Sequence, residues 1–312
     1  MSALAHVPAP GSTGGVPAEP AAARPQGRWV PYLLLAPGLV WLAMFFIVPT
    51  VTLFSTSLQT GSLAEGYRLT FEVGNYTSAW SQFWPQFGRS LIYAGLATVA
   101  ALLIAYPLAY TIAFKAGKYR NVLLVLVVAP FYTSFLLRTL AWKTILADNG
   151  VIVQTLDRLG ILEITSFLGL TADDRVLATP LAVVTGLTYN FLPFMTLPLY
   201  ASLERLDPRL VEAASDLYAS PFTAFRRVTF PLSLPGVVAG TLLTFIPAAG
   251  DYINAQLLGS LPATAMIGNV IDALFLRVLD YPRAAALSIT LMVVVVGLVT
   301  VYVRRAGTEE LV

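Results

Sequence analysis

The segment EAASDLYASPFTAFRRVTFPLSLPG, residues 212–236, is a polar interruption between two long apolar stretches. Just before it, Asp207 and Pro208 favour the start of a helix, because aspartate accepts bonds from free amide groups and proline fits the first turn. Ser220 and Pro221 repeat this signal within the segment. The sequence therefore predicts two short helices that meet at an angle, and the later prolines predict a stop before the next apolar stretch.

The first predicted helix carries an apolar stripe at helical spacing, and its two acidic residues lie on a different face. In the second helix, Phe222 and Phe225 lie on one side, and Arg226 and Arg227 lie near the end, where cations are favoured. Two interpretations fit: an amphipathic linker lying on a membrane, or a docking surface for another protein. The stripe consists of Leu210, Ala213, Ala214 and Leu217, and the acidic residues are Glu212 and Asp216.

The composition indicates a membrane protein. Of 312 residues, 57% are hydrophobic and only 12% are charged, about half the charged fraction of a soluble domain. The mean hydropathy is +0.73. The net charge of +2 gives no argument for nucleic acid as a partner.

Several kinds of catalytic or metal site are excluded or disfavoured. The chain has no cysteine, which excludes disulfides and thiolate chemistry, and its single histidine, His6, argues against a histidine metal site or a Ser-His-Asp triad. No G-x-x-x-x-G-K-[ST] loop is present, since KAGKYR at 115–120 lacks the upstream glycine and the hydroxyl residue. We therefore expect no metal site, no cofactor and no ATP hydrolysis by a P-loop in this chain.

Several apolar runs reach the roughly 20 residues that cross a bilayer, and such spans must be helical because backbone groups cannot stay unpaired in lipid. We expect an all-α membrane protein in which residues 28–305 form one domain, with the polar loop at 203–235 between the fourth and fifth of six transmembrane helices. The predicted spans are 32–58, 91–114, 122–145, 176–201, 237–258 and 287–303.

Local signals refine this picture. Pro37 and Pro49 are expected to break the first span. The pattern Gly236-x-x-x-Gly240 predicts close helix packing at the start of the fifth. Residues 1–27, rich in Ala, Pro, Gly and Ser, favour a disordered tail over a signal peptide, and residues 306–312 form a second short tail.

Lys and Arg residues near the ends of spans predict the orientation. The larger group would place both termini and the polar loop in the cytoplasm. It consists of Arg24, Arg28, Lys115, Lys118, Arg120, Arg205, Arg209, Arg226, Arg227, Arg304 and Arg305.

The polar loop resembles the EAA loop of permease subunits of bacterial ATP-binding-cassette importers. In that family the pattern is E-A-A, three residues and glycine, followed later by an apolar residue, one more residue and L-P. Residues 212–214 match its start and residues 234–235 match its end. Tyr218 stands at the glycine position, so Ala219 or Ser220 is expected to carry the turn instead.

Three further segments, 135–152, 192–208 and 246–259, look like the spermidine/putrescine branch of this family, and the resemblance covers roughly residues 30–305. It implies a type I importer permease fold in the bacterial cytoplasmic membrane, with polyamines or another small solute as cargo. It also implies a non-catalytic subunit, a second permease of a different sequence, an external solute-binding protein and two cytoplasmic ATPases that bind ATP and Mg²⁺. The implied ATPase-coupling residues are Glu212, Ala213, Ala214, Asp216, Tyr218, Ala219, Ser220, Phe222 and Arg226.

Two charged residues, Asp251 and Arg138, fall within predicted spans at similar depth. A charge at mid-membrane costs about 2.5–3.5 kcal/mol, so both should face the bundle interior or water. Either they pair with each other, or they belong to a substrate path in which Asp251 offers a carboxylate to a passing cation. Nearby aromatic residues would add cation–π contacts of about 0.5–2 kcal/mol each, unless they serve ordinary packing or interface anchoring. These are Tyr252, Trp142, Tyr132 and Tyr189.

Other classes of protein fit less well. An ion-coupled secondary transporter would need more buried ionisable residues and a detectable repeat. A membrane scaffold would explain the apolar composition but not the polar two-helix loop. A membrane enzyme would need a nucleophile and base, for which the sequence offers no plausible set.

Overall fold

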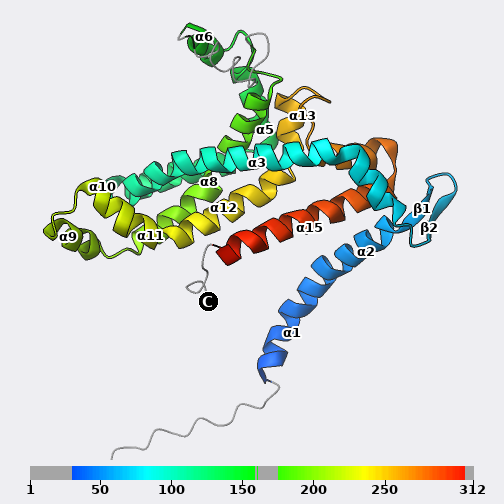
Figure 1. Cartoon of the computed structure of the whole chain (residues 1–312), viewed down its shortest axis with the longest axis horizontal. Helices are drawn as coiled ribbons and strands as arrows, with labels where there is room; N and C mark the ends of the chain where they lie inside the picture. The colour runs from blue at the N-terminus through cyan, green and yellow to red at the C-terminus, as the bar shows by residue number, and fades with distance from the viewer. Residues whose placement is uncertain (1–29, 159, 161–174, 306–312) are drawn as a thin grey trace, which may run out of the picture. The chain divides into compact units, whose positions relative to one another are not determined.

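The computed structural model describes residues 30–158, 160 and 175–305, and most of these are helical (Figure 1). The two predicted tails, 1–27 and 306–312, lie outside the described residues. The chain divides into two compact units, Met1–Thr50 and Val51–Val312.

The first predicted span is one continuous helical run, Tyr32–Ser57. It consists of α1 (Val30–Leu42), the π-helical turn η1 (Ala43–Ile47) and α2 (Val48–Ser57). The expectation that Pro37 and Pro49 break this span is wrong. The wider turn lies immediately before Pro49, where the Val48 amide donates to the Ala43 carbonyl, so the helix accommodates the proline by a π turn instead of ending.

The core of the second unit is a helical bundle. Helix α3 (Gly74–Phe114) packs against α8 (Pro180–Glu204), α12 (Leu234–Ala249) and α15 (Tyr281–Arg305). Its contact face is lined by small, fully buried residues, which let neighbouring backbones approach closely. They are Ala94, Ala97, Ala101, Ala105 and Ala109.

The predicted Gly-x-x-x-Gly contact lies between α12 and α8. A Cβ added to Gly236 would meet the Pro198 carbonyl, and one added to Gly240 would meet the Met195 carbonyl at 3.0 Å. Both glycines are buried. The absence of side chains is therefore what brings the two helices together, as the pattern predicts.

By length and composition, the described residues contain four helices able to cross a membrane, or up to six if each of two bent pairs is one span. Helix α3 begins at Gly74 instead of near residue 91. At 1.5 Å per residue, its 41 residues extend about 60 Å, twice the hydrocarbon thickness of a bilayer.

The third predicted span, 122–145, is not a single helix. A helical run that starts before residue 122 consists of η2 (Gly117–Tyr119), α4 (Arg120–Val128) and η3 (Ala129–Tyr132). Helix α5 (Phe135–Ile145) follows this run at 96°. Pro130 lacks an amide hydrogen and lies at the start of the tight η3 turn. Thr133 then takes an extended conformation, with φ −104° and ψ 150°.

The fifth predicted span, 237–258, is also interrupted. Helix α12 ends at Ala249, and a separate short helix, α13 (Ile253–Leu258), follows. Before α12, the run α10 (Pro221–Ala224), η4 (Phe225–Thr229) and α11 (Phe230–Leu232) meets it at 63°. The remaining helical elements are α6 (Val151–Arg158), α9 (Pro208–Asp216), α14 (Ile267–Ala273) and η5 (Leu274–Val278).

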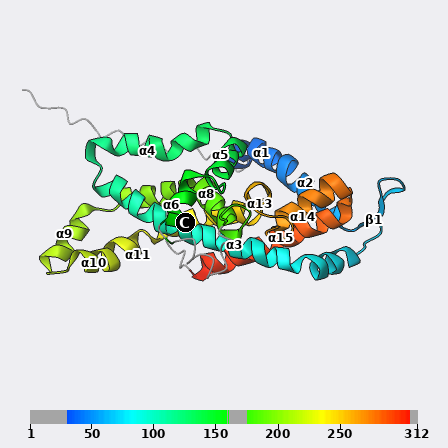
Figure 2. The ribbon, with the colours of Figure 1, turned by 90° about the horizontal axis from the view of Figure 1, so that it is seen from above.

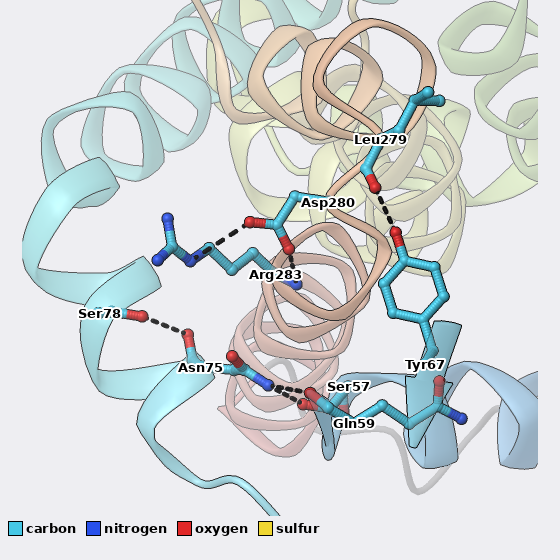
Figure 3. A network of polar contacts seen from close by, with 8 residues as sticks. All are labelled: Ser57, Gln59, Tyr67, Asn75, Ser78, Leu279, Asp280 and Arg283. Atoms are coloured by element: carbon cyan, nitrogen blue, oxygen red, sulfur yellow. Dashed lines mark hydrogen bonds and ion pairs between the residues drawn. The ribbon is translucent and has the colours of Figure 1, made fainter. Parts of the chain in front are cut away.

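The two ends of the bundle differ. Helices α9–α11 lie at one end, and an unpredicted antiparallel hairpin of β1 (Gln59–Ser62) and β2 (Gly66–Leu69) lies at the other (Figure 2). The hairpin is tethered from both sides (Figure 3). The Asn75 side chain donates to the Ser57 and Gln59 carbonyls at 3.0 and 2.9 Å, and the Tyr67 hydroxyl donates to the Leu279 carbonyl at 2.5 Å. The hairpin is therefore fixed to two segments of the bundle that are far apart in sequence.

Candidate functional site

The polar loop at 203–235, here called the elbow, begins its two helices where the sequence predicts. The Asp207 carboxylate accepts from the Arg209 amide at 3.0 Å and caps α9. The Ser220 hydroxyl accepts from the Thr223 amide at 3.3 Å and caps α10. Both caps satisfy amide groups that a helix start leaves free.

The turn between the helices is at Tyr218, which has a left-handed backbone with φ 59°. The Tyr218 amide donates to the Ser215 carbonyl at 2.9 Å, and the Ala219 amide donates to the Ala214 carbonyl at 3.1 Å. These two bonds form the capping pattern that usually places glycine in the left-handed position. The expectation that Ala219 or Ser220 carries the turn is therefore wrong. The last carbonyls of α9 require a left-handed residue at position 218, whatever its side chain.

Replacing Tyr218 with glycine should stabilise this turn, because a left-handed conformation costs an ordinary L-residue roughly 1 kcal/mol or more. We expect amide hydrogen exchange at 217–219 to slow by roughly fivefold, the equivalent of 1 kcal/mol. Tyr218→Val is the matched control, since a branched side chain tolerates this backbone worst, and it should exchange faster than the wild type. Equal exchange in all three proteins would contradict a strained turn.

The elbow exposes most of the residues that the sequence assigns to docking. The side chain of Tyr218 is fully exposed, and that of Phe222 is 71% exposed. Of the others, Glu212, Ala213, Asp216, Ser220 and Arg226 are exposed, and Ala214 and Ala219 are half-buried. No ion pair found among the described residues involves the charged members of this set.

The apolar groups of the elbow point in two directions. Leu210 and Leu217 of the α9 stripe are 47% and 81% exposed, so the bundle does not cover this stripe. Phe225 instead turns toward α3 and makes an edge-to-face contact with Tyr106 at 5.6 Å between ring centroids. Phe222 and Phe225, which the sequence places on one side of the second helix, therefore differ: Phe222 faces outward and Phe225 packs against α3.

A buried polar chain joins α5, α8 and the break between α12 and α13. The Asp251 carboxylate accepts from the Asn254 amide at 2.8 Å and from its side chain at 3.2 Å. The Asn254 side-chain oxygen accepts from the Asn190 amide group at 3.0 Å, and that group also donates to Thr139 at 3.2 Å. Asn190, Thr139 and Asn254 are at most 1% exposed, and Asp251 is 8% exposed.

The hydrogen bonds of this buried cluster all run in one direction, and they leave one acceptor atom free. Asn190 donates to Asn254, which in turn donates to Asp251, so the carboxylate is the final acceptor. The side-chain oxygen of Asn190 is buried without a hydrogen-bond partner. The cluster therefore has acceptor capacity to spare in an apolar surrounding, which favours a cationic or hydrogen-donating group.

Arg138 does not pair with Asp251. Its guanidinium lies over the rings of Phe131 and Phe135, at 5.5 and 5.6 Å from their centroids. Its Nε and Nη1 atoms are buried without hydrogen-bond partners, and no ion pair within the described residues includes it. The pairing alternative for these two residues is wrong.

The aromatic residues of the predicted path lie in different surroundings. Trp142 and Tyr189 pack edge to face at 5.2 Å between ring centroids. Tyr132 is 87% exposed at the bend before α5, and Tyr252 is 41% exposed. The structure thus brings Trp142 and Tyr189 together.

Sequence reasoning missed Asn190, Asn254 and Thr139. They come from three different predicted spans, and only the fold brings them together. The available signal was their position within predicted spans, where polar side chains tend to bond across helices or serve function.

Comparisons with known proteins agree with this architecture. A family model described as binding-protein-dependent transport system inner membrane component matches residues 27–306. The spermidine/putrescine transport system permease protein PotB of Haemophilus influenzae is 40% identical over 265 residues, which cover 85% of this chain and 90% of that protein. The inner membrane ABC transporter permease protein YdcU of Escherichia coli K12 is 31% identical over 293 residues, covering 89% of this chain and 90% of YdcU.

Two solved structures share the fold. A bacterial ABC transporter involved in importing the acidic polysaccharide alginate matches with a TM-score of 0.66 and 18% identity, over 90% of this chain and 96% of the matched chain. A complex of the bacterial alginate transporter with a periplasmic protein carrying an alginate pentasaccharide matches with the same score and identity, over 90% and 94%. At this identity the similarity concerns the fold alone.

Proposed function

The chain belongs to the family of binding-protein-dependent transport system inner membrane components, and on this premise we propose that it is a permease subunit importing polyamines with power from separate ATPases. The family membership and the importer-permease fold agree with the fold class and family that the sequence predicts. The observation that carries the proposal is the elbow, a capped two-helix loop whose polar and apolar side chains are exposed at one end of the bundle.

The elbow supports docking over a linker lying on a membrane. Charged Glu212, Asp216 and Arg226 lie on the same short segment as the exposed Leu217 and Phe222. A mixed surface of this kind, on a backbone fixed by two caps and a hydrogen-bonded turn, suits a protein partner better than lipid. We assign this end to the cytoplasm, with both termini on the same side, because the predicted charge asymmetry places it there.

Polyamines are the proposed cargo because PotB, 40% identical to this chain over 265 residues, is a spermidine/putrescine permease. The buried cluster supports a cationic solute, since it ends on the Asp251 carboxylate and leaves the Asn190 oxygen free. Tyr252, Trp142, Tyr132, Tyr189 and Arg138 complete the proposed path. The proposed assembly adds a second permease, a pair of ATPases and a solute-binding protein outside the membrane.

Reconstitution tests this function directly. Proteoliposomes carrying the complete assembly should accumulate labelled spermidine only when ATP reaches the elbow side and a loaded binding protein is on the other. Omitting the ATPase should remove accumulation. Uphill accumulation by this chain alone would refute the proposal, and ATP-driven uptake of another solute without spermidine would refute only the assigned cargo.

A further inference from the structure

An aromatic cluster joins the elbow to the C-terminal end of α3. Phe225 lies 5.6 Å from Tyr106 and 6.2 Å from Tyr110, both in edge-to-face geometry, and 6.3 Å from Phe230, measured between ring centroids. The ring of Phe230 also lies 5.9 Å from that of Tyr106. Pairs of this kind contribute beyond the burial of their area. The elbow is thus packed against the longest helix of the bundle through rings, although its other face is exposed.

A buried hydrogen bond lies beside this cluster, at the bend between the elbow and α12. The Tyr106 hydroxyl and the Ser233 hydroxyl are 2.7 Å apart, and their residues are 8% and 0% exposed. Ser233 lies between α11 and α12, which meet at 63°. Its hydroxyl also donates to the Phe230 carbonyl at 2.9 Å.

The geometry at this bend resembles a hinge held at its vertex. Pro231 and Pro235 lie on either side of Ser233, and Pro235 has no amide to continue the helical bonding. Beyond the bend, Gly236 brings α12 against α8 without an intervening side chain. The elbow side of the vertex therefore contacts α3 through rings, and the other side is fixed to α8.

We propose that Tyr106 is a positioning residue for energy coupling, which transmits displacement of the elbow to α3 through the Tyr106–Ser233 bond and the ring of Phe225. This inference rests on the proposed function, because it requires an ATPase to move the elbow. A displaced Phe225 must push or pull Tyr106, since close-packed rings have little space to absorb movement. Without the bond between the Tyr106 and Ser233 hydroxyls, we expect the bend to move with less accompanying movement of α3.

Two matched variants isolate the bond. Tyr106→Phe removes the hydroxyl and keeps the ring. Tyr110→Phe makes the same change one turn along α3, where the hydroxyl makes no hydrogen bond within the described residues and the ring also contacts Phe225. Each variant is purified as the complete assembly and reconstituted, and the measured quantity is spermidine taken up per ATP hydrolysed.

We expect Tyr106→Phe to lower this ratio about fivefold, on the scale of one buried hydrogen bond, with the ATPase still assembled and hydrolysing. Tyr110→Phe should keep the wild-type ratio. Ser233→Ala should lower the ratio as well, and combining it with Tyr106→Phe should add little, because the two side chains form one interaction.

An unchanged ratio in Tyr106→Phe, or an equal fall in Tyr110→Phe, overturns the inference and leaves the proposed function intact. Loss of uptake and hydrolysis together, in proportion to lost assembly, shows a merely structural role and overturns it as well. If the wild-type assembly shows no ATP-driven uptake, the proposed function itself fails, and the inference with it.

Discussion

Replacing Glu212 with arginine is expected to abolish ATP-driven uptake while leaving the membrane bundle intact. Glu212 is exposed on α9, has no ion-pair partner among the described residues, and lies four residues from Asp216 on the same helix. On the proposed function, this carboxylate becomes buried in an ATPase cleft. Removing one member of a buried charged contact costs about 2–5 kcal/mol, so ATPase affinity should fall by roughly 30-fold or more.

The measurement is ATPase co-purification, followed by binding-protein-stimulated hydrolysis in proteoliposomes. Glu65→Arg is the matched control, because it makes the same charge reversal on an exposed residue of the hairpin, at the opposite end of the bundle. It should retain the ATPase. If Glu212→Arg keeps both co-purification and stimulated hydrolysis, the elbow is not the docking surface.

The elbow was largely predictable because its signals are local. Asp207-Pro208 and Ser220-Pro221 each combine a side-chain acceptor with a ring suited to the first turn, and both start a helix as expected. The position of the turn was not predicted. The family's glycine suggested that tyrosine would displace the left-handed residue, but the hydrogen bonds that end α9 keep it at position 218.

The bends of the third and fifth spans show a different limit of prediction from the sequence. Pro130 was visible within the third apolar run, yet hydropathy alone treats such a run as one helix. For the fifth, Gly250 and the following two residues interrupt a continuous apolar stretch, because the Asp251 carboxylate starts a new helical turn by bonding the Asn254 amide. Hydropathy is averaged over a window of about 20 residues to identify a span, and this average hides such breaks.

The buried polar cluster was beyond sequence reasoning because Thr139 and Asn190 are distant in sequence from the Asp251–Asn254 pair. Asp251 was identified as a costly intramembrane charge, and the nearest basic candidate in depth was Arg138. The fold gives Asp251 amide donors instead and places the guanidinium of Arg138 over two phenylalanine rings. The position of a charged residue along a predicted span does not tell which face of the helix it occupies.

Replacing Asp251 with asparagine should reduce spermidine uptake by about tenfold or more, and its effect follows from the direction of the polar chain. An asparagine oxygen can still accept from the Asn254 amide and preserve the start of α13. Its amide group, however, would then face the Asn254 side-chain donor that now bonds the carboxylate at 3.2 Å. Reversing Asn254 would remove the acceptor that Asn190 uses at 3.0 Å. Either arrangement leaves a buried polar group unpaired, at about 1–3 kcal/mol, and the negative charge offered to a cationic solute is lost.

The measurement must distinguish two roles of Asp251: lining the substrate path, and capping the start of α13. Asp251→Asn should keep its membrane insertion, its bound ATPase and its basal hydrolysis, and lose uptake, since the backbone bond to Asn254 survives. Asp272→Asn makes the same change at a half-buried residue of α14, and this variant should transport normally. Unchanged uptake in Asp251→Asn would exclude the carboxylate from the path. A fall that matches a loss of assembled complex would mean that Asp251 acts by holding α13 in place, because a cap influences folding before it can influence transport.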